Sequence, residues 1–139
     1  AKAWSMGHPF VVAVCDESGV RKALSRRDGA ALLSVQIAQD KAYTAVGFGL
    51  STDGWHDFIK NDPPLALGAV GGIDRLVIFG GGYPIKAGDA IIGGIGVSGG
   101  HYKQGMEVAQ AGLAAAGGPT RSAPAGPCPG GHPRAPPKG

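Results

Sequence analysis

The 139-residue sequence predicts an α+β domain in which helices cover a mainly antiparallel sheet. Apolar, β-rich runs come in two pairs, each joined by a short turn, and such pairs are typical of antiparallel hairpins. Each pair is followed by a long window with helical spacing of apolar residues. The expected order is therefore strand, strand, helix, short helices, strand, strand, helix.

The first hairpin is expected from residues 10–16 and 20–25. Its first arm, FVVAVCD, consists largely of residues that favour strands, and Asp16-Glu17-Ser18-Gly19 supplies the turn. Ahead of it, residues 1–7 are typical of the end of a helix that begins before the chain does, with Gly7 as its cap.

A long helix is expected over residues 30–46. Asp28 is its predicted N-cap, because a carboxylate accepts hydrogen bonds from the first amides and suits the positive helix end. Gly47 and Gly49 end this helix. A short helix capped around Ser51 should follow and run to residue 59, and residues 65–73 are expected as a short helix or a loop.

Residues 76–100 form the stretch around which the chain is organised. Two apolar runs, 76–79 and 90–97, are the expected arms of the second hairpin, and residues 86–89 supply its turn. Gly93, Gly94 and Gly96 contribute no side chain to packing. Interior glycines weaken a strand, so a helix, another subunit or a ligand should approach the backbone closely here. A final helix is expected over residues 102–116.

Residues 1–118 are expected to form one domain, followed by a disordered Pro/Gly-rich tail at 119–139. The domain carries ten Lys or Arg and ten Asp or Glu, so the net charge of +3 lies in the tail and nucleic acid is not an expected partner. No segment approaches the ~20 apolar residues of a membrane span. No signal peptide is visible, which predicts a cytoplasmic protein, or a secreted one if a leader was removed.

Five sequence blocks together resemble a known family. In chain order they are VVAVCD with Gly19, RDGA at 27–30, AQDKAYTA at 38–45, GGYPI at 81–85 and GIGVSGG at 94–100. They follow the pattern of the GlcG/HbpS-like haem-binding (haem-degrading-domain) proteins, a family that includes the C-terminal domain of PduO-type cobalamin adenosyltransferases. The resemblance covers about residues 8–116.

The resemblance implies a profilin-like, three-layer α+β fold with about five antiparallel strands between helices, assembled into homo-oligomers. It also implies an association with haem in some members. The chain departs from the family pattern where the leading helix is mostly absent, and where Gly105 stands in place of a common acidic residue.

Haem needs an axial ligand, an apolar slot and cations for its propionates. His8, His56 and His101 each lie near an expected element end. His8 and His101 are the preferred axial candidates, because His8 lies beside a strand start and His101 follows the glycine motif, and Tyr83, Tyr102 and Cys15 are weaker ones. Cys15 is expected to be a buried small hydrophobe. Arg26, Arg27 and Lys41 either neutralise propionates or pair with Asp28 or Asp40. The remaining candidate binding residues line a glycine-rich pocket and are Gly81, Gly82, Gly96, Ser98 and Gly99.

Three alternatives to haem binding remain. Ser98 and His101, oriented by Asp28 or Asp40, could serve a small enzyme acting on an organic acid or carbonyl. An accessory subunit that binds a protein partner is a second alternative. The third is a divalent metal held by Asp53, His56 and Asp57, although a polar helix face explains this trio as well. No nucleotide cofactor is expected, since the G-x-G-x-x-G run lacks a βαβ unit and an acidic partner.

Overall fold

The structure is a computed structural model that describes residues 7–115, so the expected leading helix at 1–6 and the tail at 119–139 lie outside the described residues. The described chain forms an α+β fold of four strands and four helices. In order these are β1 (Val11–Asp16), β2 (Arg21–Arg26), α2 (Leu32–Phe48), α3 (Thr52–Ile59), α4 (Pro63–Gly72), β3 (Gly82–Ala87), β4 (Ala90–Ser98) and α5 (Tyr102–Ala115).

The four strands form one antiparallel sheet in the order β2-β1-β4-β3. The first hairpin is confirmed, and its turn is held by Asp16, whose Oδ1 accepts hydrogen bonds from Ser18 N at 2.9 Å and Val20 N at 3.0 Å. The two hairpins join through β1 and β4, and Val11 lies opposite Ser98. The start of β1 is therefore next to the end of β4.

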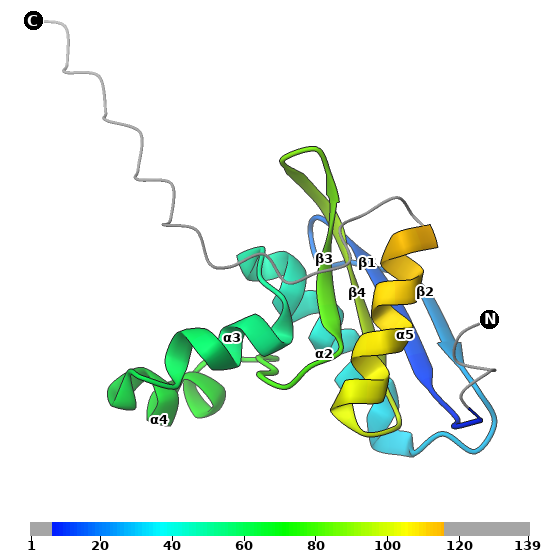
Figure 1. The fold of residues 1–139 in the computed structure, drawn as a ribbon, viewed down its shortest axis with the longest axis horizontal. Coiled ribbons are helices and arrows are strands. Elements are labelled where there is room, and N and C mark those ends of the chain that lie inside the picture. The colour runs from blue at the N-terminus through cyan, green and yellow to red at the C-terminus, as the bar shows by residue number, and fades with distance from the viewer. Residues whose placement is uncertain (1–6, 116–139) are drawn as a thin grey trace, which may run out of the picture.

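Helices α2 and α5 cover opposite faces of the sheet (Figure 1). On the α5 face, Ile95 and Val97 pack with Val108 and Leu113 in the larger core cluster. On the α2 face β4 carries glycines, because a Cβ on Gly96 would collide with Ala38 O and lie 2.7 Å from Ala42 N. Of the three expected reasons for these glycines, the close approach of a helix is the one confirmed.

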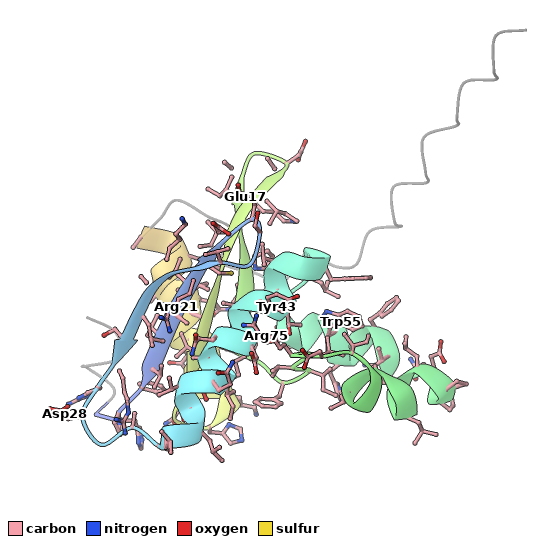
Figure 2. The ribbon with its side chains drawn as sticks, turned by 180° about the vertical axis from the view of Figure 1, so that it is seen from behind. Glu17, Arg21, Asp28, Tyr43, Trp55 and Arg75 are labelled. Carbon is pink, nitrogen blue, oxygen red and sulfur yellow. The ribbon has the colours of Figure 1, made fainter. Side chains whose placement is uncertain are left out.

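The strand expected at residues 76–79 is wrong, because β3 takes its place in the second hairpin. The described sheet has four strands, where the resemblance implied about five. This segment is bonded to α2 instead of a neighbouring strand: Thr44 Oγ1 donates to Arg75 O at 2.9 Å and accepts from Val77 N at 3.1 Å. Arg75 reinforces the attachment. Its Nε donates to Asp40 Oδ1 at 2.8 Å, and its guanidinium lies 4.0 Å from the centre of the Tyr43 ring (Figure 2).

The first arm of the second hairpin is β3, which contains part of the glycine-rich segment that was expected only to break the preceding run. Gly81 has a φ of +126°, and this turn brings the chain from α2 into the sheet. Pro84 is tolerated because β3 is an edge strand, where a missing amide hydrogen is not needed by a neighbour. The second arm and the intervening turn agree with the prediction.

The N-cap predicted for the long helix is wrong. Helix α2 begins at Leu32 after Ala31, which offers no side-chain hydrogen bond, while Asp28 lies in the preceding turn. Gly29 takes a φ of +87° there, and Ala30 N donates to Arg27 O. Ala31 is extended, with a φ of −59° and a ψ of 140°, and the helix begins after it without a side-chain cap.

The two shorter helices extend away from the sheet to one side (Figure 1). The predicted cap of α3 is confirmed, since Ser51 Oγ accepts from Gly54 N at 3.2 Å. The ambiguous segment that follows is helical, because Asp62 caps α4 and Pro63 occupies its first position. None of the helices within residues 7–115 is both long and apolar enough to cross a membrane.

Candidate functional site

A cleft of about 480 Å³ lies where β4 ends and α5 begins, against the first turns of α2. We call it the Lys41 cleft. None of its lining residues carries a carboxylate; they are Ala31, Leu33, Ser34, Ile37, Lys41, Phe79, Ser98, Gly99, Gly100 and His101. Four of the ten were singled out from the sequence as site residues, from blocks more than 50 residues apart. The fold therefore brings Lys41, Ser98, Gly99 and His101 together.

The side chain of Lys41 is buried, with 2% of its surface exposed. Its Nζ donates to Val97 O at 2.8 Å and lies 4.9 Å from the centre of the Phe79 ring. Burial lowers its pKa to about 8. The expected ion pair with Asp40 does not form, because Asp40 accepts from Arg75 and Gln36 instead. No carboxylate pairs with Lys41 anywhere in the described chain.

The predicted glycines divide into two groups. Gly81 borders the ammonium group, since a Cβ there would lie 2.9 Å from Lys41 Nζ and 2.7 Å from Val97 O. Gly82 and Gly96 instead meet the backbone of α2, at Lys41 O (2.5 Å) and Ala38 O respectively. Gly81 therefore leaves room for the amine itself, whereas Gly82 and Gly96 allow the helix to pack on the sheet.

The start of α5 forms one wall of the cleft. Ser98 is buried. Gly99 has a φ of +137°, and a Cβ there would also meet Pro9 O, so both the conformation and the space favour glycine at this position. His101 is exposed at the cleft, and its ring is oriented by the first turn of the helix: Nδ1 accepts from Lys103 N at 3.3 Å. Its backbone N donates to Gln104 Oε1 at 3.1 Å. The cleft thus presents an imidazole at its mouth and an ammonium in its interior.

His8 and Arg27 lie near the same end of the sheet but do not line the cleft. Arg27 Nη1 donates to His8 O at 3.3 Å, and the exposed His8 ring meets Phe10 edge-on, with centroids 6.4 Å apart. Arg26 is engaged elsewhere, since its Nη2 donates to Ala30 O at 2.7 Å. Of the predicted cations other than Lys41, we therefore take Arg27 as the one nearest to the Lys41 cleft.

The weaker axial candidates are placed elsewhere. Tyr83 is buried in the core, where its hydroxyl accepts from Gln110 Nε2 at 3.2 Å. Cys15 is buried against Gly94, as predicted, and burial raises the pKa of its thiol. The side chain of Tyr102 lies outside the described residues.

A second cavity of about 500 Å³ lies on the other side of Phe79. It brings together Asp53, His56 and Asp57 with Lys103 and Met106. Among residues 7–115, no group of three or more His, Cys, Asp or Glu side chains could hold a metal ion. Asp53, His56 and Asp57 lie on α3 at this cavity.

The sequence interpretation missed Ser34, Ile37 and Phe79 as cleft residues. A signal existed for the first two, since Ser34 and Ile37 precede Lys41 by seven and four residues and so share its helix face. Phe79 gave no such signal because its segment was expected to be a buried strand. Its ring is 47% exposed instead and separates the two cavities.

A family model described as "Haem degrading protein HbpS-like" matches residues 1–114. Among curated proteins, the chain is 35% identical over 116 residues to the corrinoid adenosyltransferase PduO of Salmonella typhimurium, covering 82% of this chain and 34% of PduO. It thus spans about a third of the length of that relative. It is also 34% identical over 95 residues to Protein GlcG of Escherichia coli K12, covering 68% of this chain and 65% of GlcG.

Two solved structures show the same fold with similar sequences. The crystal structure of a PduOC–haem complex matches with a TM-score of 0.77 and 32% identity, covering 87% of this chain and 88% of the other. An HbpS double mutant from Streptomyces reticuli matches with a TM-score of 0.72 and 32% identity, covering 81% and 75%. One of these relatives was therefore crystallised with haem.

Proposed function

The chain belongs to the HbpS-like family of haem-degrading proteins, and on that premise we propose that it is an oligomeric protein that binds haem, or a related planar anionic ligand, in the Lys41 cleft. The similarity to the PduOC–haem complex supports haem as the first choice of ligand.

One observation carries the proposal. A single cleft combines an imidazole, a buried ammonium without a carboxylate partner, and apolar side chains from α2 and Phe79. A haem-binding protein needs each of these: a donor for the iron, a cation for a propionate and an apolar surface for the macrocycle. A buried charge is costly unless it is paired, so an anionic ligand would stabilise Lys41 in its protonated form.

The chain's own residues take distinct roles in this proposal. His101 is the axial candidate because its ring is oriented at the cleft mouth, and His8 is the second candidate at the same end of the sheet. Lys41 holds one propionate, and Arg27, at the same end of the sheet, is the candidate for the other. Leu33, Ile37 and Phe79 exclude water from the macrocycle. Bound haem would supply a redox-active iron at this position.

The experiment is a haemin titration followed by absorbance, with wild type, His101→Ala, His8→Ala and His56→Ala in parallel. His56 is the matched control, because it is also an exposed histidine but lines the second cavity. We expect a saturable, red-shifted Soret band that His101→Ala abolishes and that His56→Ala leaves intact. A band lost only in His8→Ala would assign the axial ligand to a residue that does not line the cleft. A band lost only in His56→Ala would move the ligand out of the Lys41 cleft.

Self-association is the second part of the proposal. Helix α4 buries only Ala69 within the described chain, while Leu67 is 86% exposed and Val70 and Ile73 are exposed beside it. An exposed apolar surface of this kind is typical of a protein interface. We therefore propose that α4 packs against a second copy of the chain.

A further inference from the structure

The amine of Lys41 can also act in its neutral state, which haem binding does not use. We propose that, in the haem-free protein, Lys41 Nζ forms a reversible imine with small apolar aldehydes that enter the Lys41 cleft. This activity does not require haem binding, and it concerns the same amine in its neutral state.

The first argument is the environment of the amine. Lys41 Nζ contacts one carbonyl oxygen, Val97 O, and the face of Phe79, and no carboxylate in the described chain pairs with it. Desolvation of a lysine in an apolar pocket is one of the recognised ways of activating it as a nucleophile. With a pKa of about 8 instead of 10.5, the amine is neutral about 300 times more often near neutral pH than an exposed lysine is.

The second argument is that the amine lies at a cleft. Gly81 has no Cβ, and a Cβ added there would come within 2.9 Å of Nζ, so this glycine leaves the room that the amine itself occupies at the cleft wall. The cleft that Lys41 lines has a volume of about 480 Å³, which is ample for a molecule of a few carbon atoms. Leu33, Ile37 and Phe79 line it as well, so an apolar tail on the carbonyl carbon finds apolar contacts.

The chemistry balances without a further reactant. The nitrogen lone pair attacks the carbonyl carbon, a C–N bond forms, and one proton moves from the nitrogen to the carbonyl oxygen to give a carbinolamine. The hydroxyl then takes up a second proton and leaves as water as the C–O bond breaks and the C=N bond forms, and the nitrogen releases its remaining proton, which replaces the one taken up. Ser98 and His101 line the same cleft and are the side chains placed to exchange these protons.

The test is reductive trapping on the purified haem-free chain. Limiting butanal is added near neutral pH with sodium cyanoborohydride, which delivers hydride to an imine and leaves a stable butylamine. Peptide mapping by mass spectrometry then gives the labelling rate of each lysine. We expect Lys41 to be labelled at least ~10-fold faster than the exposed Lys22 and Lys60, because its neutral form is more populated.

Two controls separate this selectivity from general reactivity. Unfolding the chain in urea should make the three lysines react at similar rates, because the desolvated environment is lost. Lys41→Met should remove the fast site and leave the labelling of Lys22 and Lys60 unchanged. The inference is wrong if folded wild type labels Lys41 no faster than the exposed lysines. The haemin titration is independent, so haem uptake without Lys41 labelling refutes the imine alone, and labelling without haem uptake refutes haem binding alone.

Discussion

Substituting Gly96 by Ala tests how closely α2 packs on the sheet. Gly96 lies in β4, opposite Ala13 of β1 and Gly82 of β3, so neighbouring strands hold it on both sides. An added Cβ would collide with Ala38 O and lie 2.7 Å from Ala42 N, and both are backbone atoms that cannot rotate away. Either α2 or β4 must therefore shift.

Overpacking of a core typically costs about 1–3 kcal/mol. Because the clash here is with helix backbone, we expect the upper end, a loss of about 3 kcal/mol in the free energy of unfolding. A glycine-to-alanine change also restricts the unfolded chain, which offsets at most about 1 kcal/mol. The assay is urea unfolding followed by circular dichroism, with the slope compared between variants.

The matched control is Gly68→Ala in α4, where an added Cβ has nothing within 4 Å. Alanine is the better helix former, so this variant should be as stable as wild type or more stable by up to about 1 kcal/mol. The packing argument would be refuted if Gly96→Ala lost less than about 1 kcal/mol, or if it could not be distinguished from Gly68→Ala.

Two further predictions concern Lys41 and helix α4. Burial lowers the pKa of Lys41 to about 8, so between about pH 8 and 10 the unfolded chain binds more protons than the native chain, and stability should rise with pH. We expect the unfolding free energy of wild type to gain about 2 kcal/mol over this range relative to Lys41→Met, and parallel pH profiles would contradict the burial of the ammonium. For α4, Leu67→Lys should lower the molecular mass of the assembly measured by light scattering, because Leu67 is exposed on the proposed interface. Val20→Lys, in the exposed first hairpin, should leave the mass unchanged. Equal masses for wild type and both variants would exclude α4 as the interface.

Much of the fold could be predicted because its signals are local. Asp16 to Gly19 specify the first turn, the helical spacing specifies α2 and α5, and Ser51 specifies the start of α3. The prediction of a strand at 76–79 was wrong because a tertiary contact decides the conformation of this segment. The segment has strand-like residues, but its backbone bonds to Thr44 of α2, and no local pattern encodes that partner. Strand β3 was missed because it contains Gly and Pro, which are rare in strands except at an edge.

In the candidate site too, residues with a local sequence signal were predicted and those that depend on tertiary contacts were not. Lys41, Ser98 and His101 were found because they belong to recognisable sequence blocks, and the fold brings them to one cleft. A salt bridge of Lys41 to Asp40 was one of the alternatives left open, and it does not form because consecutive residues of a helix point in different directions. Asp40 reaches Arg75, while Lys41 points into the cleft toward Val97 O. Phe79 could not be predicted, since its position depends on the failed strand.

The central claim is that the Lys41 cleft is the haem site, and the most direct measurement is the Soret titration of wild type beside His101→Ala and His56→Ala. The account predicts a saturable, red-shifted band in wild type and His56→Ala. In His101→Ala it predicts that the band is absent, because His101 is the histidine that lines the cleft. No saturable band in wild type, or a band that depends on His56 alone, would contradict the claim while leaving the fold and family unchanged.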